Sequence, residues 1–112
     1  MGAVIVRGDR TLSYGYNGTP PGEDNNCEDL IDGILVTKPN VIHAEDNAIR
    51  KVHKEGEVCH GATMFTTHAP CKGCAEKIAS AGIVTVYYRN KYRSQDGLEL
   101  LKLMGIEAIH YD

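Results

Sequence analysis

The sequence predicts an α/β fold built on a five-stranded mixed sheet flanked by helices. At the N-terminus, the runs GAVIV (2–6) and TLSYGY (11–16) are apolar or alternating and enclose a turn-rich tetrad, which is typical of a β-hairpin. From residue 62 onward, strand-like and helix-like segments alternate along the chain. Such alternation is typical of parallel strands joined by right-handed helical crossovers. An N-terminal hairpin followed by three parallel strands gives the mixed sheet.

Local signals place the individual elements. Residues 17–40 are rich in Gly, Pro, Asn and Asp, so we expect mainly loop there, with at most one short turn of helix. Residues 42–55 have apolar positions at helical spacing. The other expected elements are strands at 62–67, 83–88 and 106–111 and helices at 71–81 and 95–104, with Pro70 at one helix start and Gly82 and Gly105 after the two helix ends.

Length, charge and cysteine usage limit the class of protein. The chain has 112 residues, so we expect a single domain spanning 1–112. Its formal net charge of −3 provides no basic field for gripping nucleic acid. No apolar stretch is long enough to span a membrane, which leads us to expect a cytoplasmic protein without a membrane partner. Its cysteines should then be reduced, and closely spaced reduced cysteines indicate metal binding or catalysis.

Two short motifs carry the chemistry. Cys71 and Cys74 lie three residues apart at the start of an expected helix, so that both thiols share one face. A helix N-terminus lowers the pKa of a thiol and favours the thiolate that a metal requires. His43 begins the other helix that could pack alongside. One imidazole and two thiolates predict a zinc site with an open fourth position, which is the catalytic arrangement.

Glu45, two residues after His43, supplies a carboxylate beside this predicted site. It could take a proton from water and return it to a leaving amine, which predicts hydrolytic deamination. The pattern H-x-E followed by P-C-x-x-C is the signature of zinc nucleobase deaminases. A redox pair or plain helix packing would need neither His43 nor Glu45. A structural zinc would require a fourth protein ligand, for which Cys59 and His60 are candidates.

The flanking residues narrow the interpretation further. Together with HAE and PCKGC, the runs GYNGTPPG (15–22) and NNC (25–27) make the chain resemble the deoxycytidylate (dCMP) deaminases of the zinc-dependent cytidine deaminase superfamily. The resemblance covers nearly the whole chain. It implies a cytidine-deaminase-like three-layer fold and the conversion of dCMP to dUMP. A helix between the last two strands is expected here and excludes the branch that acts on free nucleosides.

The resemblance implies a role for each matching residue. His43, Cys71 and Cys74 would hold the zinc ion, and Glu45 would move the proton. The backbone N–H of Ala44 would bind the pyrimidine carbonyl, and Asn17 would reach the sugar. For the phosphate, our candidates are Lys91, Tyr92 and Arg93, which follow the 83–88 strand at the ligand-binding edge of the sheet. The alternative for these last residues is a solvated basic loop.

Regulation by the nucleotides dCTP and dTTP is also implied by the resemblance. The candidate effector residues lie in the loop after the hairpin and are Gly15, Tyr16, Gly18 and Gly22. Glu23 and Asp24 could help to hold a Mg²⁺ ion that bridges to the triphosphate. The alternative is a surface loop that binds no effector.

One departure from the family concerns the N-terminal helix, which this chain is expected to lack. That would leave the 95–104 helix alone to cover one apolar face of the sheet, so we expect a homo-oligomer, as in the hexamers of the family. Two other functions stay open: a tRNA adenosine deaminase, and a non-catalytic zinc-stabilised module with a deaminase-like fold. The acidic net charge and the GYNG run argue against the first.

Overall fold

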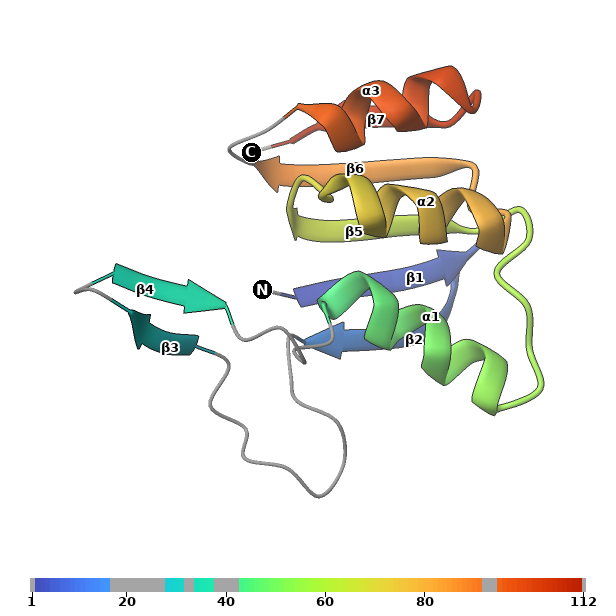
Figure 1. Ribbon diagram of the computed structural model, residues 1–112. Helices are drawn as coiled ribbons and strands as arrows, with labels where there is room; N and C mark the ends of the chain where they lie inside the picture. Colours follow the sequence, from blue (N-terminus) through green and yellow to red (C-terminus); the bar gives the residue numbers. More distant parts are fainter. Residues whose placement is uncertain (1, 17–27, 32–33, 38–42, 92–94, 112) are drawn as a thin grey trace.

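The computed structural model has one mixed five-stranded sheet with three helices, and a separate two-stranded hairpin (Figure 1). It describes residues 2–16, 28–31, 34–37, 43–91 and 95–111. The strands are β1 (Gly2–Arg7), β2 (Arg10–Tyr16), β3 (Glu28–Ile31), β4 (Ile34–Thr37), β5 (Thr63–His68), β6 (Thr85–Asn90) and β7 (Glu107–His110). The helices are α1 (Ala44–Lys54), α2 (Lys72–Ala81) and α3 (Asp96–Leu103).

The main sheet has the strand order β2-β1-β5-β6-β7. Strand β1 pairs antiparallel with both β2 and β5, whereas β5, β6 and β7 run parallel. The predicted N-terminal hairpin and the three parallel strands are therefore confirmed. Parallel neighbours joined by helices bring the carboxyl ends of β5, β6 and β7 to one edge, where ligands bind in open sheets of this type.

All three helices lie on the same face of the sheet (Figure 1). Helix α2 packs against α1 on one side and against α3 on the other. Both parallel crossovers move in the same direction across the sheet, and right-handed crossovers then place their helices on one face. The expectation that the 95–104 helix covers the other face is therefore wrong. Within the described residues, no helix lies on that second face.

The hydrophobic core fills the space between the sheet and this helical layer. Three neighbouring strands and all three helices contribute large, fully buried side chains to it: Ile5, Met64, Val86, Val52, Ile78 and Leu101. Burial of an aliphatic side chain of this size contributes roughly 1.5–3 kcal/mol. The core thus fixes α1 and α2, whose first turns carry the motif residues, on the sheet.

The segment between the first hairpin and α1 contains a feature that the composition did not predict. Strands β3 and β4 form a second hairpin with Ile31 opposite Ile34, whereas we expected residues 17–40 to be mainly loop, with at most one short turn of helix. The sequence signals for this hairpin are the β-type run ILVT and the preceding dipeptide Asp32-Gly33, which favours tight hairpin turns. Residues 17–27, 32–33 and 38–42 lie outside the described residues.

The second face of the sheet carries a row of apolar side chains. Direct cross-strand partners Tyr14, Val4, Phe65, Tyr87 and Ile109 run across all five strands on the side opposite the core. The Phe65 and Tyr87 rings are stacked, with centroids 4.8 Å apart. We refer to this set of five residues as the open-face row.

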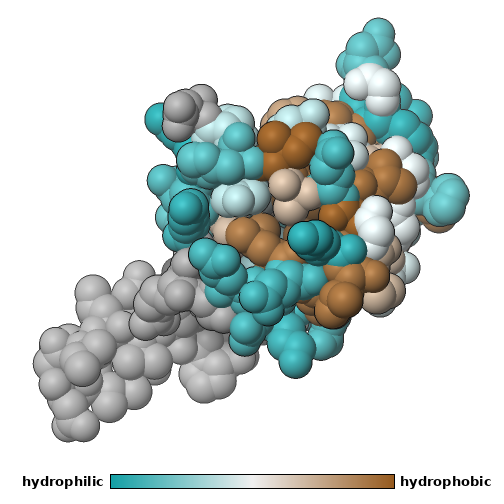
Figure 2. Space-filling view, turned by 90° about the horizontal axis from the view of Figure 1, so that it is seen from above, coloured by the Kyte–Doolittle hydropathy of each residue, from teal (hydrophilic) through white to brown (hydrophobic). Residues whose placement is uncertain are grey.

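The edge formed by α3 and β7 also exposes apolar groups. Figure 2 looks onto this edge and shows hydrophobic side chains at the surface among polar ones. Leu103 and Met104 are 83% and 59% exposed. Among the described residues, none of the helices has the length and apolar character needed to cross a membrane.

Candidate metal centre and active site

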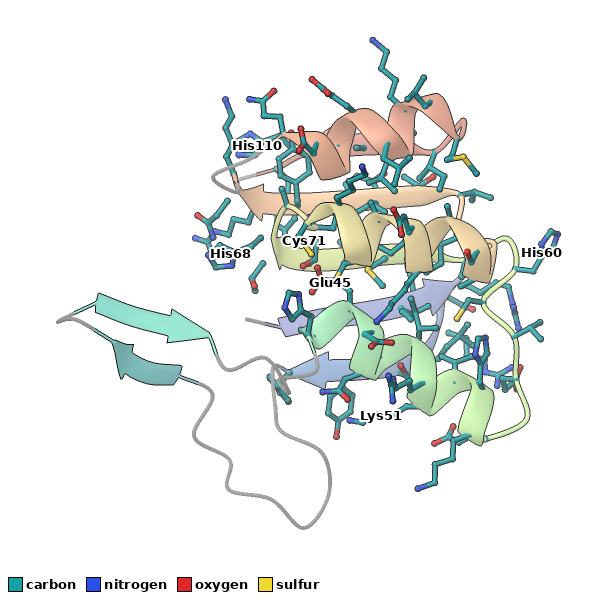
Figure 3. All side chains as sticks on the ribbon, viewed as in Figure 1. Glu45, Lys51, His60, His68, Cys71 and His110 are labelled. Carbon is teal, nitrogen blue, oxygen red and sulfur yellow. The ribbon has the colours of Figure 1, made fainter. Side chains whose placement is uncertain are left out.

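Two helix starts bring three metal-binding side chains together. His43 is the N-cap residue of α1, and Cys71 is the N-cap residue of α2, with Cys74 in the first turn of the same helix. The ligand atoms of these residues all lie within 4.8 Å of one another. Figure 3 shows this end of the sheet, where Cys71 and Glu45 lie close together at the starts of their helices. The three predicted ligands therefore converge.

The separations fit a tetrahedral zinc ion. His43 Nδ1 lies 3.6 Å from Cys71 Sγ and 3.3 Å from Cys74 Sγ. Zinc binds sulfur at about 2.3 Å and nitrogen at about 2.0–2.1 Å, which separates two such ligands by about 3.5 Å in tetrahedral geometry. Both donor types and both separations therefore suit zinc. Within the part of the chain that the structure describes, this is also the one cluster of His, Cys, Asp or Glu with metal-binding spacing.

The thiols of this cluster are unequal in the metal-free protein. A hydrogen bond from the Cys74 thiol, together with the Cys74 backbone N–H and the nearby His43, lowers the pKa of Cys71 to about 5. The same hydrogen bond and burial raise the pKa of Cys74. One thiolate is thus already stabilised at the start of α2, as the helix terminus led us to expect.

Glu45 places a carboxyl group beside the cluster from the first turn of α1. The residue is 4% exposed, and this burial raises the pKa of its carboxyl group, although its own backbone N–H and His43 partly oppose the shift. A carboxyl group with a raised pKa can both accept and return a proton near neutral pH. This is the property that a deaminase requires of its general base.

An ion-pair network next to Glu45 joins the two helices that carry the cluster. The buried carboxylate of Asp46 accepts hydrogen bonds from Arg50 at 3.1 Å and from Lys77 of α2 at 2.8 Å. Burial alone would raise the pKa of Asp46, but the two cations outweigh it and lower that pKa. A pocket of about 160 Å³ lies against the cluster and is lined in part by Asp46 and Lys77.

The other predicted site residues are only partly described. Ala44 is buried in the first turn of α1, and Lys91 is exposed immediately after β6. Gly15 and Tyr16 are the last residues of β2. The remaining candidates, Asn17, Gly18, Gly22, Tyr92 and Arg93, lie outside the described residues, as do Glu23 and Asp24.

Three contacts hold α1 on β2, and the sequence motifs did not predict them. The Ser13 hydroxyl donates to the Ala48 carbonyl at 2.6 Å, and the Asn47 side-chain amide donates to the Tyr16 carbonyl at 2.6 Å. Between them, Gly15 has its side-chain position against the backbone of α1. The sequence signal that could have predicted these contacts was the presence of small and polar residues at the end of β2, together with Asn47 in the motif HAEDNAI.

Comparisons with known proteins agree with this site. Residues 1–90 match the family described as the cytidine and deoxycytidylate deaminase zinc-binding region. The chain is similar to a dCMP deaminase from the cyanophage S-TIM5, whose crystal structure contains dCMP and dUMP, with 44% identity and a TM-score of 0.90. That match covers 98% of this chain and 79% of the phage chain.

Two further relatives show the reach of the similarity. ComE operon protein 2 of Bacillus subtilis is 39% identical over 111 residues, covering 95% of this chain and 57% of the relative. The deoxycytidylate deaminase of Enterobacteria phage T2 is 32% identical over 151 residues, covering 98% of this chain and 80% of the relative. The chain thus spans little more than half of one relative and about four-fifths of the other. On its matched residues and its His–Cys–Cys cluster, it belongs to the cytidine and deoxycytidylate deaminase zinc-binding family.

Proposed function

We propose that this protein catalyses the zinc-dependent hydrolytic deamination of dCMP to dUMP and ammonia. The observation that carries the proposal is the buried Glu45 carboxyl group beside the converging His43, Cys71 and Cys74 side chains. The choice of substrate is supported by the 44% identity to a phage dCMP deaminase that binds dCMP and dUMP. Several other relatives are also named deoxycytidylate deaminases.

In this proposal the chain's own residues position the water and move its protons. His43, Cys71 and Cys74 hold the zinc ion, which when bound supplies a Lewis acid that makes water easier to deprotonate. Glu45 accepts a proton from the attacking water as its oxygen adds to C4 of the cytosine ring. Glu45 passes that proton to ring nitrogen N3, which takes the electron pair of the C4=N3 bond. It then carries the remaining water proton from the C4 hydroxyl to the departing amino group, so that one water is consumed and one ammonia is released. The raised pKa of Glu45 suits this double role.

Substrate binding is proposed from the resemblance and from the position of the sheet edge. The Ala44 backbone N–H would bind the pyrimidine carbonyl, and Asn17 would bind the sugar. Lys91, Tyr92 and Arg93 would bind the phosphate, and Lys91 is exposed directly after β6 at the carboxyl edge of the parallel strands. A phosphate contact here would favour the nucleotide over the free nucleoside.

Regulation, assembly and location complete the proposal. We retain dCTP and dTTP as candidate effectors bound near Gly15, Tyr16, Gly18 and Gly22, with Mg²⁺ bridging to the triphosphate. A homo-oligomer is supported by the open-face row, in which Tyr14 and Phe65 are exposed, and a hexamer is what the resemblance implies. We place the enzyme in the cytoplasm, where Cys59, Cys71 and Cys74 would persist as the free thiols that the structure contains. Residues 1–112 would act as one catalytic domain.

Two alternatives have weaker support. A tRNA:A34 deaminase structure shares the fold at 22% identity, which indicates the architecture and no more. A non-catalytic zinc-stabilised module would have no use for a buried carboxyl group beside an open metal position, so Glu45 argues against it.

The test is ammonia release from three substrates supplied separately: dCMP, deoxycytidine and a tRNA anticodon stem-loop. We expect release from dCMP, much less from deoxycytidine, and none from the stem-loop. Release from the stem-loop alone would replace the proposal with the tRNA function. No release from any substrate by protein with one zinc per chain would favour the non-catalytic module.

A further inference from the structure

At Gly97, the backbone of α3 lies directly against the turn that carries the candidate metal ligand Cys71. It is the second residue of α3, and a Cβ atom built on it would lie 2.0 Å from the Pro70 carbonyl oxygen and 2.9 Å from the Cys71 carbonyl carbon. Real Cβ atoms essentially never make contacts below 3.0 Å. These neighbours are backbone atoms, so rotation of a side chain cannot relieve the contact.

Gly15 makes an equivalent contact on the opposite side of the cluster. A Cβ atom built on it would lie 2.5 Å from the Ala44 carbonyl oxygen and 2.6 Å from the Ala48 backbone nitrogen. These atoms belong to the first turns of α1, which begin directly after His43. The hydrogen bonds of Ser13 and Asn47 hold β2 and α1 together at the same place.

From these contacts we infer that Gly15 and Gly97 are positioning residues that set the separation between His43 and the two cysteines. Helix α2 packs between α1 and α3, so displacement of either ligand-bearing turn changes that separation. To relieve the Gly97 contact, the backbones of α3 and of Pro70 must move apart by about 1 Å, so that the distance from the added Cβ atom to the Pro70 carbonyl oxygen rises from 2.0 Å to at least 3.0 Å. Metal–ligand distances vary by only about 0.2 Å. The inference rests on the proposed metal centre but not on the identity of the substrate.

Gly73 provides a matched control. It is the second residue of α2, as Gly97 is of α3, and it lies between the two cysteines in the sequence. A Cβ atom built on Gly73 meets nothing within 4 Å. Alanine is the better helix former at both positions, so propensity alone would stabilise both variants. Only the contact with the Pro70–Cys71 backbone distinguishes the two substitutions.

The experiment measures zinc affinity by competition with a chromophoric chelator for the wild type, Gly15→Ala, Gly97→Ala and Gly73→Ala. Altered support of metal ligands typically costs about 10–100-fold in affinity. We expect a loss of that size for Gly15→Ala and Gly97→Ala, and wild-type affinity for Gly73→Ala. Co²⁺ absorption should show weakened thiolate charge-transfer bands in the first two variants only.

Thermal unfolding with zinc and with a chelator separates ligand placement from general loss of stability. A ligand stabilises the folded state in proportion to the logarithm of its affinity, so the rise in melting temperature on adding zinc should shrink for the two positioning variants. It should stay at the wild-type value for Gly73→Ala.

Three results would oppose these expectations, each in a distinguishable way. Wild-type zinc affinity in Gly15→Ala and Gly97→Ala would overturn the inference. Variants that stay unfolded with zinc in excess would show the glycines to be needed for the fold rather than for ligand placement, and would overturn it too. A wild-type protein that binds no zinc would instead refute the proposed metal centre itself.

Discussion

Glu45 is the residue at which chemistry and folding stability oppose each other. Its carboxyl group is buried in the first turn of α1, and burial disfavours the ionised form. Under the proposed mechanism, the folded protein would hold this group for the reaction and not for its own stability. Trade-offs of this kind are common at active sites, where a group is kept in a state that the fold alone would not select.

Glu45→Gln should therefore remove activity while stabilising the metal-free protein. The pKa of Glu45 in the folded state is raised above its unfolded value of 4.5, so the stability it confers is full below that value and is lost as pH rises through the folded pKa. Glutamine has no proton to lose. We expect the metal-free variant to exceed the wild type in urea unfolding at pH 7.5 and to match it near pH 4.

The activity of the same variant supplies the second half of this prediction. General acid–base catalysis contributes roughly 10²–10⁴-fold, so dCMP turnover by zinc-loaded Glu45→Gln should fall by at least this factor. Its zinc content should remain one per chain, because Glu45 is not among the clustered ligands. A zinc-loaded variant with near wild-type turnover would remove Glu45 from the mechanism.

Cys74→Ser provides the matching test of the ligand set. Serine offers a poorer zinc ligand in place of the thiolate, so the variant should retain less than one zinc per chain after dialysis. Metal analysis of the dialysed protein measures this directly. Undiminished zinc content would remove Cys74 from the site.

At this scale the sequence was most informative for residues that lie close together in it. His43 with Glu45, and Cys71 with Cys74, were predicted to converge from their spacing and their helix starts, and the structure brings them together. The contact of Gly97 with Pro70 could not be predicted in this way. It depends on α3 packing beside α2, which is a tertiary fact and leaves no short-range pattern.

Among the elements, the contact between α1 and α2 depends on Asp46. Its carboxylate forms ion pairs with Arg50 of its own helix and with Lys77 of α2, and both cationic side chains are more than half exposed. Asp46→Asn should lower the free energy of unfolding by about 1 kcal/mol at pH 7, since partly exposed ion pairs contribute little more than this. Glu99→Gln, which changes an exposed carboxylate of α3, is the control.

The Asp46 effect should also depend on pH. The pKa of Asp46 in the folded state is lowered below its unfolded value of 3.8, so its stabilising contribution is present above that value and is lost as pH falls through the folded pKa. Urea unfolding of wild type and Asp46→Asn should therefore converge towards pH 3. A difference that is constant from pH 7 to pH 3 would contradict this account of the network.

Strands β3 and β4 show why the elements were predicted unevenly. The composition of residues 17–40 indicated loop because turn-forming residues dominate the window as a whole. The four-residue runs EDLI and ILVT on either side of Asp32-Gly33 form strands nonetheless. A two-residue turn signal acts over a shorter range than the window over which composition was judged. The longer helices and parallel strands carry stronger periodic signals and were predicted to within a few residues.

For the molecule as a whole, the distribution of helices determines which surface is exposed. With α1, α2 and α3 on one face, the open-face row is left on the other, and Tyr14 and Phe65 are 56% and 38% exposed. The strand order predicts this for α2 and α3, because two right-handed crossovers in one direction place their helices on the same face. We had assigned the 95–104 helix without applying that rule.

We therefore expect association in solution. A contiguous apolar row across five strands favours burial against another surface. Light scattering at micromolar concentration should show an oligomer, and Phe65→Lys should shift it towards the monomer by placing a charge in the row. Wild-type protein that is a stable monomer under these conditions would contradict the proposed assembly.

The most direct test of zinc-dependent dCMP deamination is the stoichiometric conversion of dCMP by wild-type protein before chelation, after chelation and after zinc is restored. Chromatography of the nucleotides together with an ammonia assay measures both products. We predict dUMP and ammonia in equal amounts from the zinc-loaded protein, loss of both on chelation, and recovery of both with zinc. Zinc-loaded protein that forms no dUMP, or chelated protein that forms it at an undiminished rate, would contradict the account.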